Sequence, residues 1–292
     1  MNILVAPNDY YIFPTMVMLQ SLFDNTILKE EDNWNVYLLQ EDISKAKLSL
    51  FQTFVWNHGG ECHIVEIPMG IFNNAPLSIH ITKSAYYRLL APFLLPREID
   101  RILYLDSDLI AIRDVSDLYY SELSEKQALV VCEGIGVSQK DFSVYDNIGL
   151  PHDRLYFNSV VILMNLPQML DVLKDKRAIF DFIATHNVLP YHDQDILNAL
   201  FKNNLKYVDW HRWNQTIIHI NSKEEASEHL RTATIIHYAG SDKPWKYDYK
   251  SWYFSLFWKY AIKLPDGTKR YWGTLLNRSR WRIMRRLRRL FN

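Results

Sequence analysis

The chain has 292 residues, of which 48% are hydrophobic and 23% charged, and its formal net charge is zero. This size can bury a substantial core, and the composition excludes an intrinsically disordered chain. The zero conceals an asymmetry, because residues 278–292 hold seven arginines and no acidic residue, so residues 1–277 carry a net charge of −7. An acidic body of this kind argues against extended nucleic-acid binding, and we expect no nucleic-acid partner.

Cysteine content and the first residues bear on the compartment. Cys62 and Cys132 are too few for a disulfide framework, which favours a reducing environment. The start, Met-Asn-Ile-Leu-Val-Ala followed by Pro7, lacks the basic region and the apolar length of a signal peptide. No apolar stretch approaches the roughly 20 residues that a membrane-spanning helix needs. These features predict a cytoplasmic protein.

The first third of the chain alternates short apolar runs with amphipathic segments. Helices are predicted at Phe13–Phe23, from the N-cap Ser44 to Asn57, and at Ser84–Leu95, where Pro96 ends the pattern. The predicted strands are Ile3–Ala6, Val36–Leu39, Cys62–Ile67 and Ile102–Leu105. Strands that alternate with helices in this way are typical of a parallel sheet covered by helices, so an α/β fold is expected.

The rest of the chain is more mixed. Further strands are predicted at Ala128–Cys132, Val160–Met164 and Ala233–Tyr238, and further helices at Asp193–Phe201 and Ser251–Tyr260. No internal repeat and no low-complexity linker precedes about residue 263. The sequence therefore predicts one domain, residues 1–262, followed by a basic helical tail, residues 263–292.

An acidic triplet, Asp106-Ser107-Asp108, directly follows the predicted strand Ile102–Leu105. In open α/β sheets ligands bind outside the carboxyl ends of the strands, and two carboxylates at such a bend can hold Mg²⁺ or Mn²⁺ against diphosphate oxygens. The triplet alone is weak, since 21 aspartates give about 1.5 such triplets by chance and a second occurs at Asp193-Gln194-Asp195. A polar turn is the alternative interpretation.

A second polar cluster follows the strand that ends at His237-Tyr238. A histidine at a strand end can ligate a metal, although such a residue is more often structural. Gly240 permits close approach of the backbone to a phosphate, and Lys243 brings a positive charge to an anion. The combination of His237, Gly240 and Lys243 within seven residues favours an anion and metal site.

Five ordered stretches of the sequence resemble glycosyltransferase family 8, which includes bacterial lipopolysaccharide galactosyl- and glucosyltransferases and glycogenin. The resemblance extends over about residues 1–260. The matching stretches are Ala6–Tyr11, Ser84–Asp117, Tyr156–Leu166, Tyr191–Leu200 and His237–Trp245. Three positions depart from the family pattern: Asn8 in place of a common Asp, Tyr10 in place of a common Asn, and Val160 in place of a Gly.

The resemblance implies a GT-A fold, with a Rossmann-like, mostly parallel sheet flanked by helices, and it assigns residue roles. Mn²⁺, with Mg²⁺ as the alternative, would be held by Asp106, Asp108 and His237. The nucleotide would be bound by Ala6, Asn8, Tyr11, Ser107, Gly240 and Lys243, with Tyr11 stacked on uracil. The donor sugar would be surrounded by Arg88, Asn158, Asp193 and Gln194. Without the resemblance, Arg88, Asn158 and Asp193 would be interpreted as a surface arginine, a turn residue and a helix N-cap.

The family also implies a reaction. It is the transfer of glucose or galactose from UDP-glucose or UDP-galactose to a saccharide or glycolipid acceptor, with retention of anomeric configuration. Gln194 and Asp193 are the candidate catalytic residues, and two routes stay open: double displacement, or front-face attack with the leaving phosphate as base. The rival hypotheses are a metal-dependent nucleotide-sugar hydrolase or phosphotransferase, and a non-enzymatic protein that binds membrane or nucleic acid through its tail.

The tail pattern predicts a basic amphipathic helix. The residues of its apolar face are Ile283, Met284, Leu287, Leu290 and Phe291. Those of the neighbouring basic face are Arg278, Arg282, Arg285, Arg286 and Arg289. Such a helix is typical of binding in the interface of an anionic membrane, and seven arginines at roughly 1 kcal/mol each give appreciable affinity. A tail docked on the acidic body and a disordered arm are the alternatives. We therefore expect peripheral association with the inner face of the membrane, through residues 278–292.

Overall fold

The computed structural model describes residues 1–77, 82–133, 142–186, 188–218, 220, 222–249 and 251–290, and for residues 281–290 it describes the backbone alone. Within these residues, seven strands form one sheet in the order β3-β2-β1-β4-β7-β6-β8. The strands are β1 (Asn2–Val5), β2 (Asn35–Gln40), β3 (Glu61–Glu66), β4 (Arg101–Leu105), β6 (Leu129–Glu133), β7 (Phe157–Asn165) and β8 (Leu205–Val208). Only β7 runs antiparallel to its neighbours, so the prediction of a mostly parallel sheet is confirmed.

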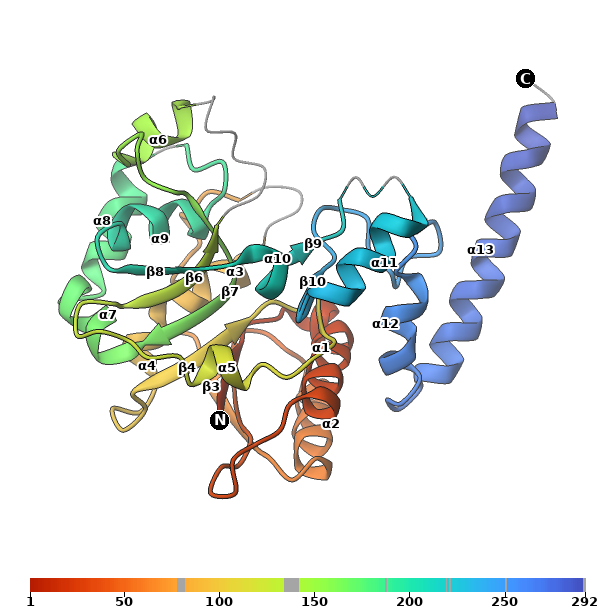
Figure 1. Ribbon diagram of the computed structural model, residues 1–292, viewed down its shortest axis with the longest axis horizontal. Coiled ribbons are helices and arrows are strands. Elements are labelled where there is room, and N and C mark those ends of the chain that lie inside the picture. The colour runs from red at the N-terminus through yellow and green to blue at the C-terminus, as the bar shows by residue number, and fades with distance from the viewer. Residues whose placement is uncertain are drawn as a thin grey trace.

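Helices cover both faces of this sheet (Figure 1). Because successive side chains of a strand point to opposite faces, Ile3 and Val5 of β1 belong to one core, and Leu4 belongs to the other. The first core lies against α1 (Ile12–Asn25), α2 (Lys45–Asn57), α5 (Ser116–Tyr119), α10 (Trp210–Trp213), α11 (Lys223–Thr232) and α12 (Phe254–Ala261). The second lies against α3 (Ser84–Tyr87), η2 (Arg88–Leu90), α4 (Ala91–Leu94), α6 (Ser143–Ile148), α7 (Leu166–Leu173), α8 (Arg177–Thr185) and α9 (Asp193–Phe201).

A small second sheet stands beside the first. It consists of β5 (Leu109–Ala111), β10 (Ile235–His237) and β9 (Gln215–Thr216), in the order β5-β10-β9. The chain leaves the large sheet at Leu105 and enters the small one at Leu109, which pairs with His237. The predicted strand Ala233–Tyr238 therefore exists, but it belongs to the small sheet.

The predicted helix Ser84–Leu95 is not continuous. It divides into α3, η2 and α4. Pro92 has no N–H to donate to the carbonyl four residues earlier, that of Arg88, and this carbonyl accepts the N–H of Ala91 instead. A second difference lies at α2, where Ser44 occupies the N-cap position but its side chain makes no capping hydrogen bond. The helices α7, α8 and α11 were not anticipated.

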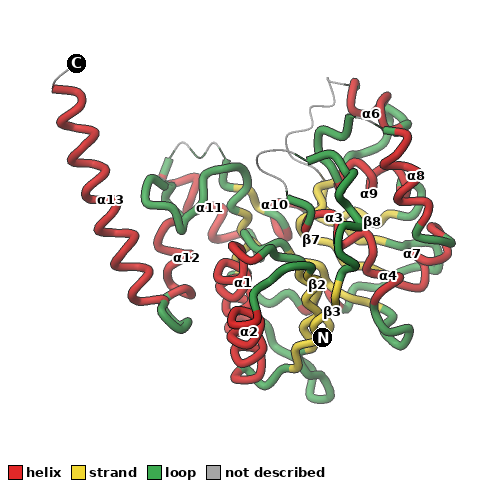
Figure 2. Tube along the Cα trace, turned by 180° about the vertical axis from the view of Figure 1, so that it is seen from behind, coloured by secondary structure: helices red, strands yellow, loops and turns green. Residues whose placement is uncertain are grey.

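The last helix, α13 (Gly267–Leu290), projects from one side of the molecule (Figures 1 and 2). Its first turns pack on α12: the ring centroids of Tyr271 and Trp258 are 5.4 Å apart, and the Arg278 guanidinium lies 4.5 Å from the centre of the Phe254 ring. The predicted apolar face beyond residue 280 lies outside the described side chains. Among the described helices, none is long and apolar enough to cross a membrane.

Candidate active site

A cleft of about 460 Å³ opens at the carboxyl ends of β1 and β4. Here successive connections lead to opposite sides of β1, which is where ligands bind in open α/β sheets. Its walls include most of the predicted site residues, namely Ala6, Asn8, Tyr11, Arg88, Asp106, Ser107, Asp108, Asn158, Asp193, Gln194, Gly240 and Lys243. His237 lies behind the wall, with 5% of its surface exposed. Residues from five separate stretches of sequence thus meet in one place.

The antiparallel direction of β7 explains why Asn158 is among them. Because β7 runs against β4, its first residues reach the edge at which β4 ends, and the Asp106 N–H donates to the Val160 carbonyl at 3.0 Å. Asn158 and Ser159 therefore lie beside the acidic triplet, 50 residues away in sequence. A parallel strand would have placed them at the opposite edge.

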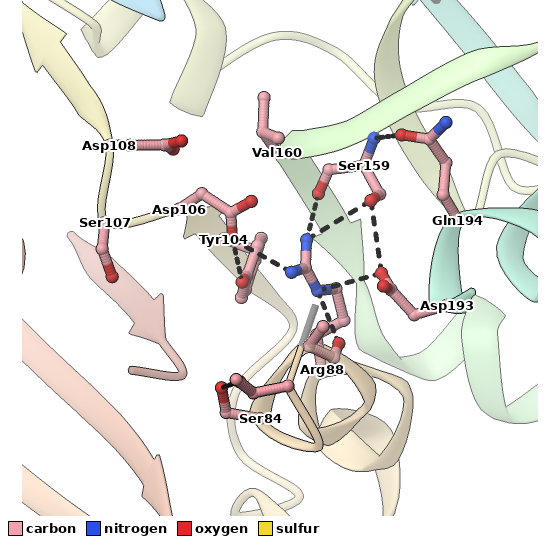
Figure 3. Close-up of polar contacts among 12 residues, drawn as sticks. Ser84, Arg88, Tyr104, Asp106, Ser107, Asp108, Ser159, Val160, Asp193 and Gln194 are labelled. Atoms are coloured by element: carbon pink, nitrogen blue, oxygen red, sulfur yellow. Dashed lines mark hydrogen bonds and ion pairs between the residues drawn. The ribbon is translucent and has the colours of Figure 1, made fainter. Parts of the chain in front are cut away.

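Arg88 is the centre of a buried ionic cluster (Figure 3). Its guanidinium donates to Asp106 Oδ1 at 3.0 Å and to the Ser159 carbonyl at 2.5 Å, and its Nε lies 3.3 Å from Asp193 Oδ2. It also stacks on Tyr104, whose hydroxyl donates to Asp106. With 4% of its surface exposed and each nitrogen engaged by the protein, Arg88 holds two carboxylates in place.

Burial in this cluster changes the pKa values of both Asp106 and Asp193. Burial raises the pKa of Asp193 to about 6, although Arg88 opposes the shift and Asp106 adds to it. Burial likewise raises the pKa of Asp106, against the effect of Arg88. Without the arginine, two carboxylates in this space would repel each other and favour protonation.

Asp108 faces the opposite side of the cleft and has different partners. Its Oδ2 lies 2.5 Å from Lys243 Nζ and 3.7 Å from His237 Nε2. Burial favours the neutral acid, but Lys243 and His237 outweigh it and hold the pKa of Asp108 below its ordinary value. The Tyr238 N–H also donates to the Asp108 carbonyl at 2.9 Å, which ties this residue to β10.

The predicted metal ligands do not converge as a set. Over the described residues, no three His, Cys, Asp or Glu side chains are grouped closely enough to hold an ion. The physical reason is that Lys243 pairs with Asp108 and Arg88 with Asp106. The donor types nevertheless fit Mn²⁺ or Mg²⁺, since both carboxylates line one cleft and His237 directs Nε2 toward Asp108.

The predicted nucleotide residues line the cleft next to Asp108. The Asn8 side chain accepts the Tyr11 N–H at 3.1 Å, and Tyr11 meets Trp245 edge to face at 5.8 Å. Burial raises the pKa of the Tyr11 hydroxyl to about 12. Ser107 Oγ is hydrogen-bonded to Thr15 at 2.8 Å. Gly240 has φ 81°, which glycine tolerates and other residues rarely adopt.

Asp193 and Gln194 begin α9 at the inner end of the cleft. His192 is the N-cap residue, so Asp193 is not the cap, and φ of His192 is 56°, an uncommon value without glycine. Gln194 Oε1 accepts two hydrogen bonds of 3.0 Å, from Asn158 Nδ2 and from the Ser159 N–H.

Sequence comparison identifies the family to which this architecture belongs. The family model described as glycosyl transferase family 8 matches residues 2–249. The chain belongs to glycosyltransferase family 8. It is therefore a sugar-transfer enzyme, and the resemblance inferred from five motifs is confirmed.

Comparisons with individual proteins show how far the similarity extends. General stress protein A of Bacillus subtilis is 27% identical over 277 residues, which cover 87% of this chain and 92% of that protein. The lipopolysaccharide 1,2-glucosyltransferase of Escherichia coli K12 is 31% identical over 171 residues, 56% of this chain and 49% of the relative. The structure of the galactosyltransferase LgtC in complex with donor and acceptor sugar analogs has a TM-score of 0.76 at 23% identity, covering 94% of this chain and all of that one. This likeness shows that the fold is GT-A.

Three contributors to this family 8 site were not identified from sequence. Tyr104 lies within the predicted strand Ile102–Leu105, where no pattern marks its hydroxyl as a partner of Asp106. Ser159 offers both its carbonyl and its N–H to the site, which no side-chain pattern reveals. Asn214 is completely buried, and its Oδ1 lies 2.9 Å from His237 Nδ1. It lies in the polar segment Asp209–Gln215, in which Trp210 and Trp213 are candidates for acceptor binding but nothing marks Asn214 as a partner of His237.

Proposed function

We propose that this enzyme transfers glucose or galactose from a UDP-sugar to a saccharide or glycolipid acceptor, with retention of configuration and with Mn²⁺ as cofactor. The observation that carries the proposal is the composition of one cleft. It brings together two carboxylates, Asp106 and Asp108, a lysine, Lys243, and the polar pair Asp193 and Gln194. The metal and the diphosphate would then bind in one part of the cleft, and the sugar in the part next to it.

In this proposal Asp106, Asp108 and His237 hold the metal, which would stabilise the negative charge that develops on the leaving diphosphate. Lys243 leaves Asp108 when the ligands engage, and its ammonium then meets the diphosphate as a fixed cation. Gly240 lets the backbone approach the phosphates, Tyr11 stacks on uracil, and Ala6, Asn8 and Ser107 complete the nucleotide side.

The donor sugar lies toward Asn158, Asp193 and Gln194, with Arg88 behind it. Both acceptor directions of Gln194 Oε1 are already used by Asn158 and Ser159, so its oxygen is poorly placed to attack carbon. Asp193 is engaged by Arg88 and by the Ser159 hydroxyl at 3.2 Å. These contacts favour the front-face route, in which the leaving phosphate removes the acceptor proton.

A donor screen tests the function. UDP release is measured with UDP-glucose, UDP-galactose, UDP-GlcNAc and UDP-GalNAc, in Mn²⁺ and in EDTA, with and without saccharide acceptors. We expect release with one of the two hexose donors, dependent on metal and stimulated by acceptor, and an α-linked product by NMR coupling. Release that no acceptor changes would favour a hydrolase, and a β-linked product would contradict retention.

We further propose that residues 263–292 form a separate segment that attaches the cytoplasmic enzyme to an anionic membrane. The described part of α13 presents Trp272 and Leu276 to solvent, 59% and 60% exposed, while Tyr271 and Arg278 face α12. The exposed pair lies four residues apart, on one side of the helix, and continues in register to the apolar positions predicted beyond residue 280. If the tail were docked on the acidic body, Trp272 and Leu276 would be expected to be buried against it.

A further inference from the structure

The buried residue Asn214 connects the two halves of the cleft. Its Oδ1 lies 2.9 Å from His237 Nδ1, and its Nδ2 donates to Asn158 Oδ1 at 3.0 Å. Asn158 Nδ2 in turn donates to Gln194 Oε1 at 3.0 Å. Three amides therefore form a continuous chain of hydrogen bonds from His237, on the small sheet, to Gln194, on α9. We call these four side chains the amide relay.

The direction of the amide relay is set by backbone groups. The Ser159 N–H can only donate, so Gln194 must turn its oxygen toward it. Asn158 must then offer its NH₂ to Gln194, and the Val160 N–H, 3.3 Å from Asn158 Oδ1, favours the same orientation. Each amide has one accepting and one donating end, so an orientation fixed at one end passes along the chain.

The same logic reaches His237. With Asn158 Oδ1 facing it, Asn214 must present NH₂ on that side and its oxygen on the other. His237 then donates from Nδ1 to Asn214, which leaves Nε2, 3.7 Å from Asp108 Oδ2, as the ring nitrogen available to a metal. An unprotonated ring nitrogen is the form that ligates a metal.

We propose that Asn214 is a positioning residue that sets the tautomer of His237 and the amide orientation of Gln194 together. The catalytic role of Asn214 rests on the proposed function, whereas the position of the His237 proton follows from the hydrogen bonds alone. Asn214 contacts no substrate in this proposal. It acts through His237 on the metal side and through Asn158 on the sugar side. One buried side chain thus orients the groups on both sides of the proposed donor site.

Two substitutions separate the two sides. Asn214→Asp keeps an oxygen that accepts from His237 Nδ1 but loses the N–H that Asn158 Oδ1 needs. Asn214→Leu, of similar size, loses both. Asn165→Asp is the matched control, because Asn165 caps α7 away from the cleft. There too a carboxylate keeps the accepted bond, from the Gln168 N–H at 3.3 Å, and loses the donated one, to the Gln127 carbonyl at 3.2 Å.

The first readout is ¹⁵N NMR of His237 in the full-length enzyme without metal or nucleotide, at alkaline pH. We expect the proton on Nδ1 in the unsubstituted enzyme, in Asn214→Asp and in Asn165→Asp. In Asn214→Leu we expect the proton to move toward Nε2. A proton on Nε2 in the unsubstituted enzyme would overturn the proposal.

The second readout is Mn²⁺ affinity by calorimetry with UDP present, alongside kcat for sugar transfer. Asn214→Leu should weaken Mn²⁺ binding by about 10- to 100-fold and lower kcat. Asn214→Asp should leave Mn²⁺ affinity within about threefold while lowering kcat by about tenfold or more, by the same second-shell range. Equal losses of Mn²⁺ affinity and of kcat in Asn214→Asp and Asn214→Leu would contradict the proposal and indicate a structural role only. If no UDP-sugar is turned over yet the tautomer is as expected, the proposed function fails alone.

Discussion

The two aspartates of the acidic triplet differ in how firmly the protein holds them. Asp106 is paired with Arg88, whose nitrogens all contact protein groups. Asp108 is paired with Lys243, whose ammonium has two partners within the described part of the chain, Asp108 and the Tyr238 carbonyl at 2.6 Å. One carboxylate thus belongs to a fixed cluster, and the other has a partner that a ligand can replace. A diphosphate and a metal would enter at the second.

Arg88→Met should have the largest effect. It leaves Asp106 and Asp193 buried with no cation, and breaking a buried ion pair in this way costs about 3–5 kcal/mol. We expect a loss of unfolding free energy of that size in urea denaturation, together with loss of sugar transfer. A variant as stable as the unsubstituted enzyme would show that the cluster is not the fixed half of the site.

Asp108→Ala should abolish Mn²⁺ binding and sugar transfer while the protein stays folded, because the residue lies at a strand end beside the cleft rather than in either core. Calorimetric titration of Mn²⁺ with UDP present measures the first effect, and circular dichroism the second. Unchanged Mn²⁺ affinity would place the metal elsewhere.

Lys243→Met should separate metal binding from turnover. Without nucleotide, Mn²⁺ affinity should rise, because the ammonium no longer competes for Asp108. The rate of sugar transfer should fall by about 10²–10³, the cost of removing one stabilising group from a developing oxyanion. Lys246→Met provides the control, since the Lys246 ammonium donates to the Ser241 carbonyl at 2.8 Å and not to a carboxylate. A lower Mn²⁺ affinity in Lys243→Met would show that Lys243 is as fixed a part of its half of the site as Arg88 is of the other.

Truncation after Leu264 should have the smallest effect on the cleft. Transfer to a soluble saccharide should change by less than about threefold, while salt-sensitive co-sedimentation with anionic vesicles should be lost. Trp272→Ser with Leu276→Ser in the full-length chain should weaken vesicle binding without removing an arginine. Equal sedimentation of the full and truncated proteins would exclude the tail as the anchor.

What the sequence could predict followed from local pattern. The short apolar runs gave β1, β2, β3 and β4, and the rule that ligands lie at strand ends led to Asp106 and Asp108. Family resemblance added the residues that have no local signal, such as Arg88 and Gln194. The cleft does bring these residues together.

What the sequence could not predict depended on tertiary placement. The antiparallel direction of β7 is a property of pairing, not of composition, yet it alone brings Ser159 to the site. Lys243 was expected beside a diphosphate, and its pairing with Asp108 joins two residues 135 positions apart, which no local pattern reveals. Asn214 acquires its role only because β9 and β10 lie side by side.

The bend between β4 and β5 divides the acidic triplet between two sheets. Asp106 is fastened to the large sheet through the Val160 carbonyl, and Asp108 to the small sheet through Tyr238. An ion shared by the two carboxylates would therefore add a connection between the two sheets, which already share one hydrophobic core and the hydrogen bond from Asn214 to Asn158. Slowed amide exchange on metal binding should then extend to β9, a strand that offers no ligand. The metal would thus stabilise the contact between the two sheets in addition to acting as a Lewis acid.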